Sequence, residues 1–186
     1  MRLIEDEVAR WNRDGFLHIP SLLPPVAQER FRRWVIAANG DEPASLARDA
    51  RGLSNHSAAY LASHHTGLAR LLERGLLPEI AAQLLGAPVR PADSASSPTH
   101  RLVKCVVALQ DGLAQPYEVM AGQYQQDEDE PQGDWTSIQI EAGDLLWVHG
   151  LAPHRGHPSQ ALFLEYRALD TQTTFGWSEH GLRARA

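Results

Sequence analysis

Histidines between residues 149 and 157 are the side chains best suited to chemistry. His154 and His157 flank an Arg-Gly pair, and His149 lies five residues before His154. Because imidazole changes charge near neutral pH, this cluster could act as an acid or base, or bind a metal. Solvated loop histidines would give the same pattern. A zinc site that adds His100 is a further alternative, although its spacing matches no recognised zinc motif.

Arg167 is the candidate for holding an anionic ligand. Alternation along residues 161–169 places Phe163, Glu165 and Arg167 on one face of a strand. Arg167 then either binds a ligand carboxylate or pairs with Glu165 outside a barrel.

Four further residues complete the candidate site. Asp111 precedes a glycine and could instead form a turn, and Trp147 could instead belong to the hydrophobic core. The candidates are Tyr124, Asp111 and Glu118 as catalytic helpers, and Trp147 as a pocket wall.

The elements that must position these residues change character along the chain. Helical periodicity dominates residues 1–90, and Gly15, Gly40 and Gly86 are placed to end helices. Thr66 is placed to cap one of them. The expected helices cover 3–12, the stretch from Pro24-Pro25 to Gly40, 66–74 and 77–85, with one strand at 16–20.

Strand-like patterns dominate residues 91–186. Residues 91–99 have linker-like composition, and the expected strands are 102–109, 117–121, 136–140, 145–149 and 161–169. Asp144 follows Gly143 in a turn and is expected to bond backbone there. Helices followed by antiparallel strands predict one α+β domain over 1–186, with helices packed on a sheet sandwich or open barrel.

Composition excludes several classes of partner. The net charge is −6 with no basic block, which argues against nucleic acid and anionic membranes. No apolar run approaches the roughly 20 residues that cross a bilayer, and the acidic N-terminus does not resemble a signal peptide. The single cysteine, Cys105, fits a reducing compartment and is expected to be a buried small hydrophobe, so we expect a cytoplasmic protein. A small-molecule substrate is the expected partner, and a homo-oligomer stays open.

Several stretches, in order, resemble the phytanoyl-CoA dioxygenase-like branch of the Fe(II)/2-oxoglutarate oxygenases. WNRDGFLHIPSLLPPVAQERFRRWV resembles the family's entry strand and helix, and PEIAAQLLGAPVR the helix before its barrel. KCVVALQD resembles a central strand, and YEVMAGQY stands where members often carry Pro-Gly-Ser-His. IEAGDLLWVHGLAPHRGHPS resembles the segment that carries the distal histidine.

The resemblance implies a double-stranded β-helix, or jelly roll, shortened here. In that family a His-x-Asp pair and a distal His hold iron, and an Arg binds 2-oxoglutarate. His154 matches the distal His, and Arg167 is the best candidate for the Arg.

The iron ligands depart from the family pattern. None of the nine histidines is followed two positions later by Asp or Glu, and His100 has Leu102 there. The stretch near 91–104 is short for the missing pair, through natural loss or a missing segment.

Three functions remain open. The first is a small-molecule tailoring enzyme, of the natural-product type, that uses metal-independent acid–base chemistry: isomerisation, cyclisation, elimination or hydrolysis. The second is an Fe(II)/2-oxoglutarate oxygenase with an unusual ligand set, such as His154 and His100 with a loop carboxylate. The third is a non-catalytic binding protein. No cofactor is implied unless the second holds.

Overall fold

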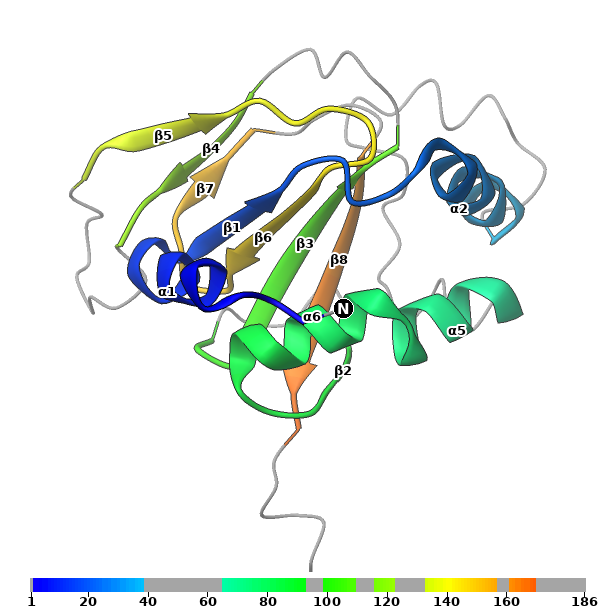
Figure 1. The fold of residues 1–186 in the computed structure, drawn as a ribbon, viewed down its shortest axis with the longest axis horizontal. Helices are drawn as coiled ribbons and strands as arrows, with labels where there is room; N and C mark the ends of the chain where they lie inside the picture. The colour runs from blue at the N-terminus through cyan, green and yellow to red at the C-terminus, as the bar shows by residue number, and fades with distance from the viewer. Residues whose placement is uncertain are drawn as a thin grey trace, which may run out of the picture.

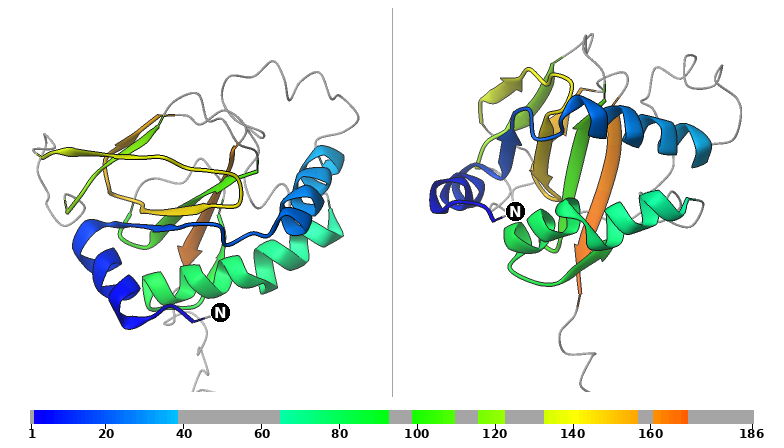
Figure 2. Two further views of the ribbon diagram at one scale, coloured as in Figure 1. Left: turned by 45° about the horizontal axis from the view of Figure 1, so that its top comes forward. Right: turned by 45° about the vertical axis from the view of Figure 1, so that its right-hand side comes forward.

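Two antiparallel sheets and a helical layer make up the computed structural model. It describes residues 2–38, 65–92, 99–109, 116–122, 133–156 and 161–169. The smaller sheet lies over one face of the larger, and the helices cover the other face (Figures 1 and 2). This arrangement confirms the predicted α+β class.

The helices begin and end close to where the sequence predicts. Gly15 and Gly86, both with positive φ, follow the ends of the first and last helices, as expected. The cap of the third described helix differs from the prediction, because the Nδ1 atom of His65, not Thr66, accepts hydrogen bonds from the N–H groups of Gly67 and Leu68. The described helices are α1 (Glu5–Asp14), α2 (Pro25–Ala38), α5 (Thr66–Arg74) and α6 (Leu76–Leu85).

The strands form a five-stranded sheet in the order β1-β6-β3-β8-β2 and a three-stranded sheet in the order β5-β4-β7. The five long strands of the second half lie where the alternation predicts them. Two short ones, β2 and β7, were not predicted. The strands are β1 (Phe16–Ile19), β2 (Val89–Pro91), β3 (Leu102–Ala108), β4 (Tyr117–Met120), β5 (Trp135–Ile138), β6 (Leu145–His149), β7 (His154–Arg155) and β8 (Ala161–Ala168).

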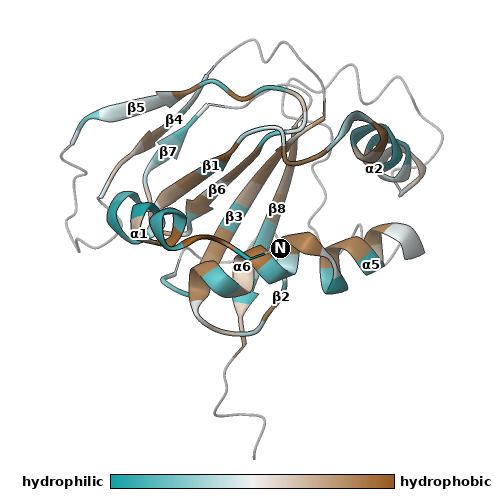
Figure 3. Ribbon diagram, viewed as in Figure 1, coloured by the Kyte–Doolittle hydropathy of each residue, from teal (hydrophilic) through white to brown (hydrophobic). Residues whose placement is uncertain are grey.

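The central strand β3 separates two hydrophobic cores. Val103, Cys105 and Val107 face the helices, where they pack in one cluster with Trp147 and residues of α5 and α6. Val106 and Ala108 belong to a second cluster, between the two sheets, with residues of β4 and β5. Most of β3 is hydrophobic and brown in Figure 3, which agrees with its burial on both faces. Cys105 is fully buried, as the sequence predicts, and burial raises the pKa of its thiol.

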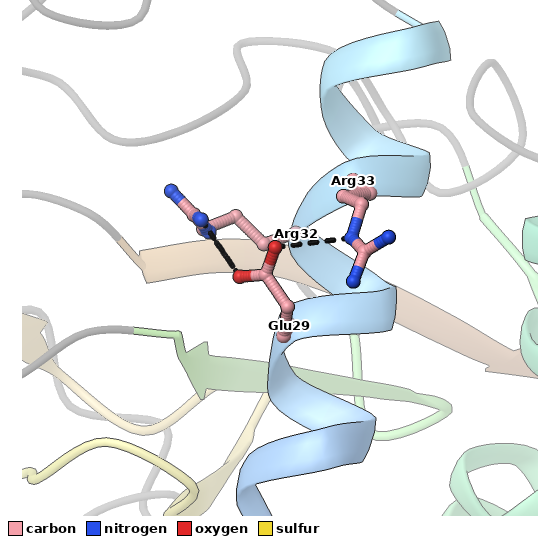
Figure 4. Close-up of polar contacts among 3 residues, drawn as sticks. All are labelled: Glu29, Arg32 and Arg33. Carbon is pink, nitrogen blue, oxygen red and sulfur yellow. Dashed lines mark hydrogen bonds and ion pairs between the residues drawn. The ribbon is translucent and has the colours of Figure 1, made fainter.

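The exposed face of α2 carries charged side chains. Glu29 binds Arg32 and Arg33, three and four residues along the helix (Figure 4). Hydrogen bonding from Arg32 is the main cause of a lowered pKa at Glu29. Among the described residues no helix is both long and apolar enough to span a membrane.

Asp144 joins the start of β6 to the loop that follows β1. Its carboxylate accepts hydrogen bonds from the backbone N–H groups of Ser21 (2.8 Å) and Glu141 (2.9 Å) and lies 2.8 Å from His18 Nε2. Burial opposes ionisation, but the two N–H donors and His18 outweigh it, so the pKa of Asp144 is lowered. The expected backbone-bonding role of Asp144 is confirmed.

We predict that Asp144→Asn lowers the free energy of unfolding by about 1–3 kcal/mol at pH 7. The amide is uncharged and has only one acceptor oxygen, so it cannot accept all the hydrogen bonds that the two carboxylate oxygens accept. Since the folded pKa lies below the unfolded value of about 3.9, the carboxylate stabilises the protein above that pH. The difference between wild type and variant should therefore shrink as the pH falls below about 4. Urea unfolding at both pH values measures it, with Asp134→Asn, at an exposed position, as control. Equal stability of Asp144→Asn and wild type at pH 7 would contradict the assignment.

Candidate functional site

A pocket of about 230 Å³ lies between β3 and β8 of the larger sheet and β4 and β7 of the smaller one. Its size suits a small metabolite, slightly below the usual range for drug-sized ligands. Ionisable and apolar side chains share its wall. The lining residues are Lys104, Tyr117, His154, Arg155, Gly156, Phe163, Leu164 and Glu165.

His154 has a defined tautomer in this pocket. Its Nδ1 atom lies 2.8 Å from the carbonyl oxygen of Ala152, which can only accept, so Nδ1 carries a proton. The Nε2 atom of the neutral ring therefore presents a lone pair, and Lys104 Nζ lies 3.2 Å from it. The Lys104 ammonium thus donates to the ring nitrogen that carries the lone pair.

Backbone packing fixes where the His154 ring lies. The ring stacks on Tyr117 with 5.8 Å between centroids and 14° between planes. Next to it Gly156 has φ 101°, and a Cβ atom there would lie 2.7 Å from the carbonyl oxygen of Pro116. Since only glycine allows this close approach of β7 to β4, Gly156 keeps His154 against Tyr117.

Arg155 forms the exposed rim of the pocket. Its guanidinium binds the Glu118 carboxylate on the neighbouring strand and lies 4.2 Å from the centroid of the Trp135 ring. Glu118, a predicted catalytic helper, therefore lies one residue from the pocket wall and holds Arg155 in place.

The inner face of β8 carries Phe163, Glu165 and Arg167, as the alternation predicts. Phe163 packs against the core between the sheets, so this face points into the sandwich rather than outward. Burial raises the pKa of Glu165, and the nearby charges of Lys104 and Arg167 oppose the rise. Glu165 Oε2 and Arg167 Nε are both buried without a hydrogen-bond partner, and such atoms are costly unless a ligand or water satisfies them.

His149 belongs to a different part of the molecule. It continues the helix-facing side of β6, and its ring lies 5.9 Å from that of Trp11 and 5.8 Å from that of His100. Burial, with the charge of His100, lowers the pKa of His149 to about 4, so the ring is neutral at pH 7. The structure therefore does not bring His149 and His100 together with His154 in the pocket.

Trp147 is fully buried in the core between the larger sheet and the helices, with its ring 6.1 Å from that of Tyr166. Of the two roles open to it in the sequence, the structure places it in the core. The remaining candidates, Tyr124, Asp111 and His157, lie outside the described residues.

Lys104 and Arg155 are pocket residues that the sequence analysis missed. Lys104 stands in an apolar run, where the inward and outward faces cannot be told apart by alternation. One signal was available: of the 17 Lys and Arg residues 16 are Arg, which leaves Lys104 as the only lysine of the chain.

Metal ligands are sparse in this region. Across the described part of the chain, no three His, Cys, Asp or Glu side chains are grouped so that they could hold a metal ion. His154 could supply one nitrogen, but that nitrogen faces an ammonium group.

Comparison with known proteins identifies a distant relative in sequence. No protein-family model matches the chain. A methylphosphonate hydroxylase from Gimesia maris is 21% identical in an alignment 212 positions long, which covers 90% of this chain and 82% of that protein.

Several solved structures match this chain in fold. The non-haem carbocyclase SnoK of nogalamycin biosynthesis, which depends on α-ketoglutarate (2-oxoglutarate), superimposes with a TM-score of 0.68 at 17% identity, over 91% of this chain and 85% of its own. The epimerase SnoN superimposes with a TM-score of 0.67 at 18% identity, over 97% of this chain and 91% of its own. HygX from Streptomyces hygroscopicus was solved with nickel, 2-oxoglutarate and hygromycin B. It superimposes with a TM-score of 0.66 at 14% identity, over 89% of this chain and 88% of its own. The chain therefore has the double-stranded β-helix fold of the phytanoyl-CoA dioxygenase-like, 2-oxoglutarate-dependent oxygenases, which confirms the fold that the resemblance implied.

Proposed function

We propose that this protein is a small-molecule tailoring enzyme in which His154 acts as general acid and base without a metal. The observation that carries the proposal is the contact between Lys104 Nζ and the lone-pair nitrogen of His154 inside the pocket. Isomerisation, cyclisation, elimination and hydrolysis can all proceed by proton transfer between a substrate and such a residue.

The mechanism assigns a separate task to each neighbour of His154. Ala152 holds the Nδ1 proton, so only Nε2 takes a proton from the substrate or returns it. The Lys104 ammonium stabilises negative charge that develops on a substrate oxygen when the proton leaves. Tyr117 and Phe163 limit the access of water to this exchange.

Two arginines provide the binding energy for an anionic substrate. Arg155 stands at the rim of the pocket. Arg167 is not one of the lining residues but lies two positions beyond Glu165 on the same face of β8, with a buried Nε atom that has no hydrogen-bond partner. A guanidinium binds a carboxylate through two parallel hydrogen bonds, so we propose Arg167 as the clamp for a substrate carboxylate. The pocket volume limits that substrate to a small acid.

The second candidate is an Fe(II)/2-oxoglutarate oxygenase, and the relatives favour it. Methylphosphonate hydroxylase, SnoK, SnoN and HygX are similar to this chain, and HygX was solved with 2-oxoglutarate bound. Iron would supply oxidative chemistry, but the residues do not fit it. No His-x-Asp or His-x-Glu exists in the sequence, the described residues offer no trio of ligands, and an ammonium lies against the His154 nitrogen.

Anaerobic titration with Fe(II) decides between the two candidates. We expect no stoichiometric binding and no tightening by 2-oxoglutarate, because a metal at His154 would have to displace Lys104. Elemental analysis of the purified protein and a calorimetric titration measure this. One tightly bound iron per chain, with succinate formed from 2-oxoglutarate in air, would establish the oxygenase and overturn the metal-free proposal.

Proton exchange tests the acid–base role of His154 directly, whatever product the enzyme forms. In D₂O the protein should speed the replacement of the C3 protons of pyruvate by deuterium, and His154→Gln should reduce this by about 10²-fold, as expected for loss of a positioned base. Proton NMR of pyruvate gives the rate. His18→Gln is the matched control, since Gln can still donate to Asp144 and position 18 lies outside the pocket. Exchange no faster than in buffer, or unchanged in His154→Gln, would contradict the proposal.

A further inference from the structure

Lys104 is the only lysine among 17 Lys and Arg residues, and it stands in the candidate site. Wherever else the chain places a long cationic side chain, it uses arginine, as on α2 where Arg32 and Arg33 bind Glu29 (Figure 4). Arginine keeps its proton at any pH that a protein survives, whereas lysine can lose one and become a nucleophilic amine. The single use of lysine therefore occurs where an amine would be useful.

The surroundings of Lys104 leave its nitrogen available. Lys104 faces Glu165 across the β3–β8 ladder and Val148 across the β3–β6 ladder. Among the described residues no carboxylate forms an ion pair with it, and Glu165 Oε2 has no hydrogen-bond partner. A lysine that served only to neutralise Glu165 would pair with it. Instead Nζ is directed to a nitrogen of His154 that can accept its proton.

The pocket supplies the other requirements of amine chemistry. A nucleophilic lysine needs a base to remove its proton, an acid to protonate the leaving oxygen, and walls that restrict water. His154 can perform both proton transfers through Nε2, and Tyr117, Phe163 and Leu164 provide apolar walls.

We propose that Lys104 forms an imine with a small carbonyl compound that carries a carboxylate, a 2-oxo acid being the simplest case. This inference rests on the proposed acid–base function of His154 and extends it. The Lys104 ammonium gives a proton to His154, and its lone pair attacks the carbonyl carbon, which yields a carbinolamine. His154 returns the proton to the hydroxyl group, the C–O bond breaks, and water leaves. The products are a protonated imine, one water molecule and neutral His154, so atoms and charge balance without a redox partner.

Reductive trapping with pyruvate tests the proposal on the intact chain. Cyanoborohydride reduces an imine to a stable secondary amine, which adds the mass of pyruvic acid less one oxygen atom. We expect this adduct on Lys104 in the wild type, by intact mass and peptide mapping, and no adduct at position 104 in Lys104→Arg. His154→Gln should slow trapping by about 10²-fold, since it removes the acid–base group, while His18→Gln should trap at the wild-type rate.

A relocated lysine provides the matched control for ordinary amine reactivity. The double variant Lys104→Arg with Arg33→Lys again has one lysine, on the exposed side of α2. It should trap pyruvate at least tenfold more slowly than the wild type, and circular dichroism and thermal unfolding verify that each variant is folded.

Three outcomes would overturn the imine. They are no adduct on Lys104 of the folded wild type, trapping as fast at the relocated lysine as at Lys104, or trapping that His154→Gln leaves unchanged. If pyruvate still exchanges its protons and this exchange still requires His154, the proposed acid–base function survives the loss of the imine. If trapping and exchange both fail, both proposals fall.

Discussion

The burial of β3 on both faces is the constraint on which the rest of the structure depends. Its residues pair with β6 on one side and β8 on the other, and they supply side chains to the helix-facing core and to the core between the sheets. A strand in this position must be apolar on every residue unless a polar side chain finds a partner. Lys104 is the one exception in the strand, and because it is half-buried its environment must compensate for the partial loss of water around its ammonium group.

That compensation explains the arrangement of the pocket. A half-buried ammonium group needs acceptors, and the His154 nitrogen on β7 lies 3.2 Å from Lys104 Nζ. The two-residue strand β7 exists because Gly156 lets the chain approach β4 closely, and this approach stacks His154 on Tyr117. The contact between Lys104 and His154 is therefore a product of sheet packing, with each residue on a strand rather than on a loop, and strands position functional groups more precisely than loops do.

The elements that carry a periodic pattern of apolar residues could be predicted from the sequence. Periodicity located α1, β6 and β8 to within a residue or two, because many residues carry the signal in each. Strands of two or three residues, such as β7 and β2, carry too little pattern to be recognised, and this is why His154 looked like a loop residue.

The candidate site was harder to predict for a related reason. Alternation placed Glu165 and Arg167 on one face but could not say that the face points inward. It could not separate His149 from His154 either, although the first packs on Trp11 and the second faces the pocket. The role of Lys104 depends on contacts between residues 50 positions apart, which no local pattern contains.

The absence of a His-x-Asp pattern from the sequence and the presence of Lys104 beside His154 have related electrostatic consequences. A divalent metal ion at the His154 nitrogen would stand a few ångströms from an ammonium group, and at an effective dielectric constant of about 20 the two would repel each other by roughly 8 kcal/mol at 4 Å. An Asp ligand normally offsets part of the metal's charge, and without it the repulsion is not compensated. Conversely, an ammonium group carries one charge rather than two, and the neutral His154 ring can accept its hydrogen bond without a carboxylate. Within the described part of the chain, Lys104 therefore provides the hydrogen-bond partner of the His154 nitrogen in a fold that oxygenases share.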